Sequence, residues 1–431
     1  MDGGKRALVV GGGLAGLAAA LLLRRRGFAV DLCEQAGEVG GRARTQTLGG
    51  ARFNLGPHAL YRGGPAERLL AELGVEVSGR VPPVSGSLAY DRGRLHALPG
   101  GPVSLLSTGL LPLAAKLELG RFLAGLPRLA AEREAGATFA EWAERTLREP
   151  GARALAHALV RVSTYANAPD RLSAGAALGQ LRLAVRNNVR YLDGGWQRLV
   201  DALAGTAGRE GVRLAPGQRA AAVERCAGCR GLAVRLASGT SLEADAVVLA
   251  VSPERASELV DGGQQPALAA WARERLPVRA AVLDLALRGL PEPRRGFVVG
   301  IDRPLYFSVH SRAAELAPPG VAAVSLARYL APGESGGGAL DELEAFADGV
   351  QPGWRERLLA RRFLPALTVS EDLPTAARGG LAGRPGPAVP GVPGLFVAGD
   401  WVGPRGFLLD AALASAEQAA EEAAVAAREA A

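Results

Sequence analysis

The stretch Val9–Gly16, with the sequence VVGGGLAG, decides the fold of this chain. An apolar run at 7–10 leads into it, and an alanine- and leucine-rich segment follows it. A second apolar run at 29–33 ends on Glu34, which lies 23 positions after Gly11. Strand, glycine-rich turn, helix, strand and acid in this order are typical of a unit that binds a dinucleotide. The sequence therefore predicts an adenine dinucleotide as ligand, with Glu34 meeting its ribose hydroxyls.

Three of the four glycines of this stretch have separate physical roles. Gly11 permits the tight turn, Gly13 lets the backbone approach a pyrophosphate, and Gly16 lets the helix pack closely on the strand. Leu14 and Ala15 begin the predicted helix. Their N–H groups, together with the positive end of the helix dipole, are therefore expected to face the phosphates.

The composition is that of an ordinary globular protein of 431 residues, with 48% hydrophobic and 22% charged residues. A chain of this length exceeds what one hydrophobic core usually serves, so we expect two lobes. The net charge of +7 is modest, and no lysine- and arginine-rich tract is interleaved with aromatic residues. We therefore expect no binding of nucleic acid.

The three cysteines, an odd number, do not form a disulfide framework. Cys33 lies in the second predicted strand and is interpreted as a small hydrophobic residue. Cys226 and Cys229 have the spacing of a redox or metal-binding pair, but no second pair accompanies them. Because a strand-like segment follows at 232–236, a hairpin turn is the favoured interpretation. The histidines without carboxylates or cysteines clustered nearby in sequence are His96, His157 and His310, so we predict no metal site.

The sequence also indicates where the protein resides. The first predicted strand begins within a few residues of Met1, which leaves no room for a cleavable signal peptide. No apolar run reaches the roughly 18 residues needed to span a bilayer. We therefore expect a cytoplasmic protein.

The nucleotide-binding lobe is predicted to be assembled from three separated pieces, at 1–79, 190–265 and 376–431. Each piece contributes at least one apolar run. The runs at 244–251 and 394–398 show no alternation, which fits parallel strands that are covered on both faces.

Two insertions, at 80–189 and 266–375, separate these pieces and are predicted to meet in one substrate lobe. The first begins with short strands near 87–90 and then becomes mostly helical. The second carries period-2 patterns at 278–287 and 321–325. The predicted fold class is therefore α/β, with a Rossmann-type nucleotide lobe and a discontinuous α+β substrate lobe.

Three motifs besides the glycine-rich turn carry a family resemblance. They are EQAGEVGGRART at 34–45, DGGW at 193–196 with the helical pattern after it, and LFVAGD at 395–400. Together with the turn they span nearly the whole chain in the expected order. The chain resembles the group of flavin-dependent amine oxidases, protoporphyrinogen oxidases and phytoene desaturases. The two insertions match loosely, and they are where the identity of the substrate would be determined.

The resemblance implies FAD, rather than a nicotinamide, as the cofactor. Gly41 and Arg42 would contact its phosphates, and Asp400 would hold its ribityl chain. The helix after Gly406 would point its positive end at the N1/O2 edge of the flavin. Ala220 aligns with the backbone position that contacts adenine, where the family usually has valine. The resemblance also implies cofactor contacts by further residues in and near these motifs, namely Gln35, Gly56, Pro57, Gly399 and Leu408.

Structural explanations compete with two of these roles. Gly40 and Gly41 also suit a plain turn, although a diglycine followed by arginine soon after a dinucleotide motif favours a phosphate contact. Asp400 also suits a cap on the turn that follows it, and the family context favours the ribityl role. Asp410 stands where the family usually has glycine, and the sequence offers no physical account of that change.

Segment 53–61 matches the family strand that passes the flavin ring, and it supplies two candidates for the reaction. His58 would act as an acid or base or would orient the substrate. A hydrogen-bonded structural histidine is an equal alternative. Tyr61, with Trp401, would wall the pocket over the flavin, although such aromatic side chains often only pack.

A lysine that many flavin amine oxidases place near flavin N5, through a water, has no equivalent here. By resemblance the corresponding strand is 277–283, which contains no lysine. Arg279 lies in it, but an arginine does not serve as a titratable base. No second glycine fingerprint indicates an NAD(P)H domain, so electrons are expected to come from an organic substrate. They would leave to oxygen, a quinone or another acceptor.

Residues 103–131 are rich in leucine and alanine, interrupted by Lys116, Glu118, Arg121 and Arg128. A helical wall of the substrate lobe is one interpretation. The other is an amphipathic patch that rests on the inner face of a membrane and admits a lipid-soluble substrate.

These observations rank the candidate functions. An FAD-dependent oxidoreductase that dehydrogenates an apolar organic substrate, with hydride transfer to flavin N5, comes first because the amine-oxidase lysine is missing. A flavin amine or amino-acid oxidase is the second candidate. A flavin-dependent isomerase or mutase without net oxidation is the third. The oligomeric state does not follow from the sequence.

Overall fold

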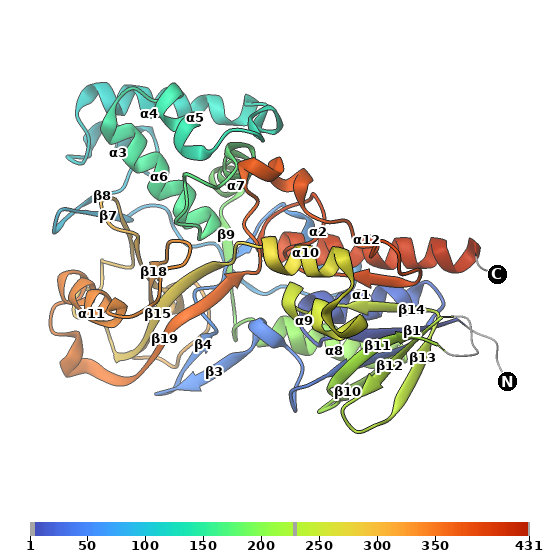
Figure 1. Cartoon of the computed structure of the whole chain (residues 1–431). Helices are drawn as coiled ribbons and strands as arrows, with labels where there is room; N and C mark the ends of the chain where they lie inside the picture. Colours follow the sequence, from blue (N-terminus) through green and yellow to red (C-terminus); the bar gives the residue numbers. More distant parts are fainter. Residues whose placement is uncertain (1–4, 227–230, 430–431) are drawn as a thin grey trace.

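The structure is a computed structural model of the chain and describes residues 5–226 and 231–429. A five-stranded parallel sheet forms the core of one half of the molecule (Figure 1), in the order β10-β2-β1-β14-β20. The strands are β1 (Arg6–Val10), β2 (Ala29–Glu34), β10 (Arg213–Pro216), β14 (Ala246–Leu249) and β20 (Leu395–Val397). The sheet therefore combines strands from the beginning, the middle and the end of the chain.

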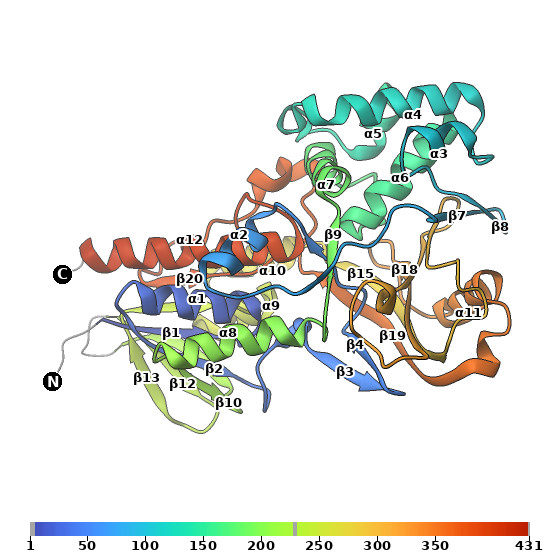
Figure 2. The same ribbon diagram turned by 180° about the vertical axis from the view of Figure 1, so that it is seen from behind.

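Both faces of this sheet are covered. Helices α1 (Leu14–Arg25), α8 (Gln197–Arg209) and α12 (Leu408–Glu429) pack on one face, which Figure 2 shows in front. On the other face lie α9 (Pro253–Leu259), α10 (Pro266–Glu274) and the antiparallel sheet of β11 (Ala220–Arg225), β12 (Leu232–Leu236) and β13 (Ser241–Ala244).

Neighbouring side chains of β1 show why the apolar runs do not alternate. Val9 packs into the core beneath α1, α8 and α12, and Leu8 packs into the core on the opposite face. Both side chains are buried. A parallel strand that is buried on both faces needs apolar residues at every position, as predicted.

A seven-stranded sheet forms the core of the other half, in the order β19-β15-β18-β17-β16-β7-β8. Its neighbours are antiparallel except for β7 and β16, which are parallel. The strands are β7 (Leu88–Asp91), β8 (Arg94–Ala97), β15 (Val278–Arg288), β16 (Phe297–Gly300), β17 (Leu305–Val309), β18 (Val321–Tyr329) and β19 (Leu358–Ser370). The β7–β16 pair joins the two predicted insertions in one sheet, while the exact domain boundaries stay a prediction.

Helices cover both faces of the seven-stranded sheet. One face packs on α11 (Ala339–Val350). Residues of the other face share a core with α4 (Leu113–Gly125), α5 (Phe139–Thr146), α6 (Pro150–Thr164) and α7 (Ala174–Asn187). Helices α4 and α5, with α3 (Pro102–Ser107), lie at the edge of the molecule away from the parallel sheet (Figure 1).

Short elements connect the two halves. They are β3 (Thr45–Leu48), β4 (Ala51–Asn54), β5 (Leu60–Tyr61), β6 (Gly79–Arg80), β9 (Val189–Leu192) and α2 (Pro65–Glu72). Strand β9 pairs with both β5 and β6. As a result, the end of the predicted flavin segment 53–61 lies beside the chain that returns from the helical part.

Cys226 lies between the two strands of a hairpin. Strands β11 and β12 pair in antiparallel fashion, and Cys226 directly follows β11. This pairing confirms the predicted hairpin, while Cys229 lies outside the described residues. The described part of the chain contains no helix long and apolar enough to cross a bilayer.

Candidate functional site

A cavity of about 450 Å³ opens at the carboxyl ends of β1, β2, β14 and β20. The crevice beyond the carboxyl ends of parallel strands is the usual place for a ligand in such sheets, and this volume suits a small molecule or cofactor. The wall is built from loops and element ends of both halves of the molecule. The cavity therefore lies where a nucleotide and a substrate would meet.

The glycine-rich turn shapes one wall of the cavity by steric constraint. Gly11 has φ +108°, and a Cβ atom there would lie 2.4 Å from the carbonyl oxygen of Ala250. A Cβ atom on Gly16 would lie 1.9 Å from the carbonyl oxygen of Gly11. Gly16 thus permits the close approach of α1 to the turn, and it does not itself line the cavity.

Open space faces the middle of the turn. A Cβ atom on Gly13 would meet no atom within 4 Å, and Gly13 lines the cavity with Leu14 and Ala15. Gly13 is the N-cap of α1, so the first N–H groups of the helix have no partner within the helix. Helix N–H groups beside open space form a ready site for an anion such as a phosphate.

Glu34 holds the turn and faces the same cavity. Its Oε2 accepts a hydrogen bond from the Gly12 N–H at 2.7 Å, and its Oε1 accepts one from the Ala36 N–H at 2.8 Å. Each carboxylate oxygen retains a further lone pair for a hydroxyl group. The ribose contact stays a prediction, and Glu34 has the position and the acceptor capacity for it.

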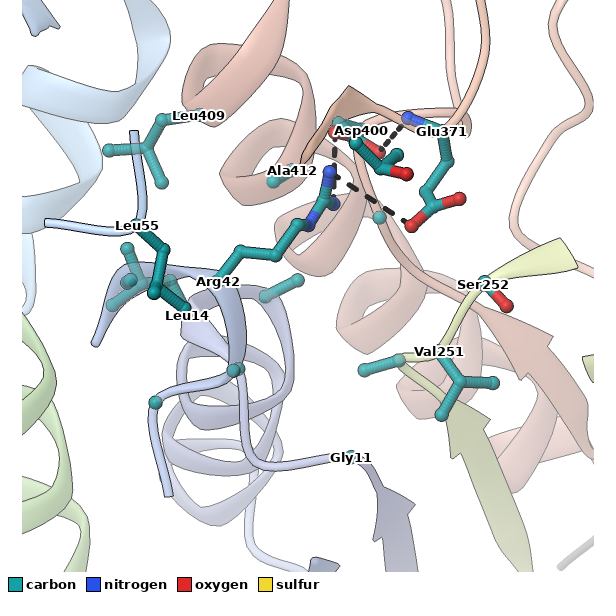
Figure 3. A pocket seen from close by; sticks show the side chains of 18 of the residues that line it. Gly11, Leu14, Arg42, Leu55, Val251, Ser252, Glu371, Asp400, Leu409 and Ala412 are labelled. Carbon is teal, nitrogen blue, oxygen red and sulfur yellow. Dashed lines mark hydrogen bonds and ion pairs between the residues drawn. The ribbon is translucent and has the colours of Figure 1, made fainter. Parts of the chain in front are cut away.

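Arg42 reaches across the cavity to the last parallel strand. It lies in the short 3₁₀ helix Gly41–Ala43, and its Nη2 is 3.0 Å from Oδ2 of Asp400. Its Nη1 donates to the Val369 carbonyl at 3.2 Å and lies 4.0 Å from Oε1 of Glu371 (Figure 3). One cation and two carboxylates therefore lie together in this part of the cavity.

Glu371 is a charged member of this wall that sequence reasoning missed. It follows β19, and its N–H donates to Oδ1 of Asp400 at 3.3 Å. Its Oε2 pairs with Nη1 of Arg275 at 2.7 Å. Burial, partly offset by Arg42, raises the pKa of Glu371. The only local signal was an acidic residue at the end of a strand, which many exposed strands also show.

Three further residues of the wall were also missed. Arg255 donates from Nη2 to the Ala220 carbonyl at 2.7 Å, which occupies the backbone position predicted to meet adenine. Tyr165, with φ +61° at the end of α6, donates to the Pro57 carbonyl. Trp196 packs its ring 4.7 Å from that of His58, and its Nε1 is buried without a hydrogen-bond partner among the described residues.

His58 lines the cavity as a neutral imidazole. Its Nδ1 lies 2.9 Å from the Gly56 carbonyl oxygen, which accepts only, so Nδ1 carries the proton. Burial, with Arg42 and Arg362 nearby, lowers the pKa of His58 to about 4. The remaining ring nitrogen, Nε2, is therefore an unprotonated base at neutral pH.

The two aromatic candidates lie differently from one another. Tyr61 is buried, donates to the Ser163 carbonyl at 2.7 Å and is absent from the cavity wall. Trp401 lines the cavity, and its indole N–H donates to the Val251 carbonyl at 3.1 Å. Trp401 therefore belongs to the wall beside the end of β14, and Tyr61 packs from β5 against α6.

The other predicted cofactor residues gather around the cavity. Those that line it are Gln35, Gly41, Gly56, Pro57, Ala220, Gly399 and Leu408. Gly56 has φ +93°, a backbone conformation that favours glycine. Leu408 has φ +53°, a strained conformation for a leucine at the start of α12.

The structure explains the aspartate at position 410, for which the sequence offered no physical account. Its Oδ1 accepts a hydrogen bond from the Ala66 N–H at 2.9 Å, so it caps the N-terminus of α2 from α12. A Cβ atom on Gly64 would lie 2.4 Å from Oδ2 of this carboxylate. The aspartate therefore joins two helices that are far apart in the sequence.

Neither lysine of the chain belongs to the cavity wall. Lys5 donates to the Ala427 carbonyl. Lys116, on α4, donates to the Leu106 carbonyl at 2.8 Å. Arg279 lies at the exposed start of β15. The described residues of the cavity wall thus include no lysine that would titrate beside a flavin.

The donor set of the cavity fits FAD. Helix N–H groups and Arg42 suit a pyrophosphate, and Glu34 and Asp400 supply carboxylates for the hydroxyl groups on either side of it. Near His58 the wall consists of Leu55, Gly56 and Pro57, which suit an aromatic ring system. Arg42 is thus flanked by the separated carboxylates of Glu34 and Asp400. A dinucleotide requires this pattern, because its pyrophosphate lies between two polyhydroxylated arms.

Comparisons with known proteins agree with this assignment. The family described as flavin containing amine oxidoreductase matches residues 14–280, more than half of the chain. The coproporphyrinogen III oxidase of Mycobacterium tuberculosis (strain ATCC 25618 / H37Rv) is 30% identical over 312 residues. That match covers 65% of this chain and 66% of the relative, just under two thirds of its length. A 1-hydroxycarotenoid 3,4-desaturase of Flavobacterium is 47% identical over 53 residues, 12% of this chain and 11% of the relative.

Solved structures share the fold across almost the whole chain. A redesigned putrescine oxidase has a TM-score of 0.75 at 18% identity, over 98% of this chain and 99% of its own. An oxidoreductase from Methanosarcina mazei has a TM-score of 0.74 at 18% identity, over 96% and 100% of the two chains. The chain belongs to the flavin-containing amine oxidoreductase family, which confirms the predicted fold class, family and FAD cofactor.

Proposed function

We propose that this protein is an FAD-dependent oxidoreductase that dehydrogenates an apolar organic substrate, with a hydride passing from a substrate carbon to flavin N5. The observation that carries the proposal is the uncharged wall around His58. Tyr165 and Leu367 join Leu55 and Pro57 in this wall. The described residues of this wall include no carboxylate that could pair with a substrate ammonium group.

The nearest charges are neutralised by partners of their own. Arg42 is paired with Asp400, and Arg362 is paired with the buried Asp284 at 2.6 Å. An apolar substrate therefore meets no unpaired charge near His58, whereas a charged amine would lose its hydration without a counter-ion. This difference favours an apolar substrate over an amine.

FAD, when bound, supplies the two-electron acceptor. The chain's own residues then have two tasks. The apolar wall excludes water, and Nε2 of His58 accepts the proton that leaves the substrate when its hydride departs. The Gly56 carbonyl keeps the imidazole in the tautomer that leaves Nε2 free. An external acceptor must reoxidise the flavin after each turnover.

The family relatives suggest which compounds with a large apolar ring system or chain to test. The match to the coproporphyrinogen oxidase extends over 312 residues, and the match to the carotenoid desaturase extends over only 53. Because the longer match includes far more of the chain, a reduced cyclic tetrapyrrole is the first substrate to test. A polyene is the second.

Anaerobic mixing of the purified flavoprotein with each compound tests the proposal. Coproporphyrinogen III, a carotenoid precursor and putrescine are added separately, and bleaching of the visible flavin absorbance is followed. We expect the tetrapyrrole or the polyene to bleach the flavin, more slowly in His58→Asn than in the wild type. Bleaching by putrescine alone would overturn the proposal and favour an amine oxidase.

A further inference from the structure

Two buried side chains of opposite charge flank the start of α12. Asp410 is the third residue of the helix and is 2% exposed, and Arg384 approaches from the loop before β20 and is 5% exposed. The same turn of the helix supplies Leu408, Leu409 and Ala412 to the cavity wall. Both charges therefore lie directly behind the wall, out of contact with bulk water.

Arg384 is held by its neighbours but is not neutralised by contact. Its Nη1 donates to the Gly406 carbonyl at 2.9 Å, and its Cζ lies 5.4 Å from the ring centroid of Phe407. Its Nε and Nη2 have no hydrogen-bond partner within the described residues. The carboxylate of Asp372 is already held by Arg378 at 2.7 Å. Burial lowers the pKa of Arg384 to about 10, so it remains a cation at neutral pH.

Asp410 is a buried anion on the other side of the start of α12. Its Oδ1 caps α2, and its Oδ2 is buried with no hydrogen-bond partner in the described part of the chain. The groups around it are the Ala66 N–H and Glu67 from α2 and Tyr61 from β5. Burial raises the pKa of Asp410 to about 6, so it is an anion above that pH.

Gly406 lies between the two charges and fixes their spacing. Its carbonyl accepts from Arg384, and a Cβ atom on it would lie 2.6 Å from the Cβ of Asp410. The backbone then passes through the strained Leu408, which lines the cavity. The two charges are therefore fixed relative to the helix start and to each other.

We propose that Arg384 and Asp410 set the reduction potential of the bound flavin in opposite directions. Arg384 raises the potential and Asp410 lowers it. The inference rests on the proposed flavin chemistry and on the ring edge lying at the start of α12, as the family resemblance implies. Reduction adds negative charge to that edge, which a buried cation stabilises and a buried anion destabilises in a medium of low dielectric constant.

The test measures the two-electron midpoint potential of the holoprotein by anaerobic titration with a reference dye, without any substrate. Arg384→Gln removes the charge and retains a donor for the Gly406 carbonyl. Asp410→Asn removes the charge and retains an acceptor for the Ala66 N–H. The controls are Arg405→Met and Glu417→Gln, which break an ion pair between two residues that do not line the cavity.

We expect the potential to fall in Arg384→Gln, to rise in Asp410→Asn and to stay unchanged in both controls. Each shift is expected to reach a tenfold change in the ratio of the binding constants for oxidised and reduced FAD, about 30 mV for two electrons. Shifts in the same direction, or shifts no larger than those of the controls, would overturn the proposal. A protein that oxidises none of the proposed substrates would still give this result, so the two failures are distinguishable.

The pH dependence gives a second readout that a purely structural role would not produce. The difference between Asp410→Asn and the wild type is expected at pH 8 and should disappear below about pH 6, where Asp410 binds a proton. A difference that persists at pH 5 would contradict the charge effect. If Arg384→Gln fails to fold, the pH series of Asp410→Asn decides the proposal for Asp410. Arg384→Lys then replaces Arg384→Gln. Because lysine retains the charge, no shift of the midpoint potential is expected in that variant.

Discussion

The Nη2 atom of Arg42 lies 3.0 Å from the Oδ2 atom of Asp400, and this ion pair joins the first and last pieces of the nucleotide-binding half across the cavity. Arg42 follows the second strand of the parallel sheet, and Asp400 follows the last strand. Glu371, from the other half of the molecule, completes the group. The cofactor site therefore closes only when three distant segments come together.

Arg42→Ala and Asp400→Ala are each expected to weaken FAD binding by about 10- to 100-fold. Hydrogen bonds to charged groups contribute about 1.5–3 kcal/mol each, and either change also leaves a charge without its partner. Titration of FAD into the apoprotein, followed by flavin fluorescence, measures the Kd. Arg145→Ala, which breaks an exposed ion pair on α5, is the control. Unchanged flavin affinity in both variants would contradict the predicted cofactor contacts.

Glu34→Gln is expected to weaken FAD binding almost as much as Glu34→Ala, by about tenfold or more. Both carboxylate oxygens accept from backbone N–H groups, so the amide of glutamine would place an NH₂ group against one of these donors. The same titration measures the effect. The exposed Glu38, on the same segment, provides the control Glu38→Gln. Wild-type affinity in Glu34→Gln would show that the carboxylate does not hold the turn and the ribose.

His58 is expected to leave no titration near pH 6.5 in the rate of flavin reduction. Its pKa is lowered to about 4, so Nε2 is unprotonated across the neutral range and becomes protonated only in acid. The rate should therefore be constant with pH down to about 5 and fall below that. Stopped-flow reduction by the substrate, with His58→Asn for comparison, measures the profile. An inflection near 6.5 that disappears in His58→Asn would contradict the lowered pKa.

Asp410→Asn is expected to stabilise the fold at pH 8 and to have little effect at pH 4. The folded-state pKa of about 6 lies above the ordinary value of 3.8, so the wild type loses stability as the pH rises through this interval. The loss amounts to about 3 kcal/mol at 1.36 kcal/mol per pKa unit. Urea unfolding at both pH values measures it.

The exposed Asp302, between β16 and β17, gives the matched control Asp302→Asn. That variant should be neutral at both pH values, because its carboxylate stays hydrated in either state. Equal stability of Asp410→Asn and the wild type at pH 8 would show that the carboxylate is not strained by burial.

The nucleotide-binding turn could be predicted because its determinants are local. Gly11, Gly13 and Gly16 follow from backbone conformation and close packing within one turn. Glu371 and Tyr165 could not be predicted, because each reaches the cavity only through the packing of an insertion against the parallel sheet. Their neighbours in the sequence carry no trace of that contact.

Tyr61 and Asp410 show the same limit for single residues. The sequence placed Tyr61 over the flavin, whereas its hydroxyl bonds to Ser163 on α6. No role of Asp410 could be predicted, because its partner Ala66 is far away in the sequence. In both cases a contact between distant segments, rather than a local pattern, decides what the side chain does.

Helices α3 and α4 carry an apolar surface, which we propose contacts a membrane. Val103 and Leu113 are 81% and 65% exposed, and Leu106 and Leu117 are also exposed. The opposite side of α4 buries Leu119 and the neighbouring Ala115 and Phe122 in the core, so this helix is both a wall and an outer surface. Lys116 lies between the exposed leucines, which suits an anionic lipid surface.

Co-sedimentation with liposomes that contain anionic lipid tests this contact. We expect the wild type to pellet with the liposomes and the double variant Leu113→Glu, Leu117→Glu to remain in the supernatant, because two charges would replace the apolar side chains that enter the lipid. Val425→Glu changes an exposed valine on α12, in the nucleotide-binding half, and should pellet like the wild type. A wild type that ignores liposomes would leave α3 and α4 with only the role of a helical wall.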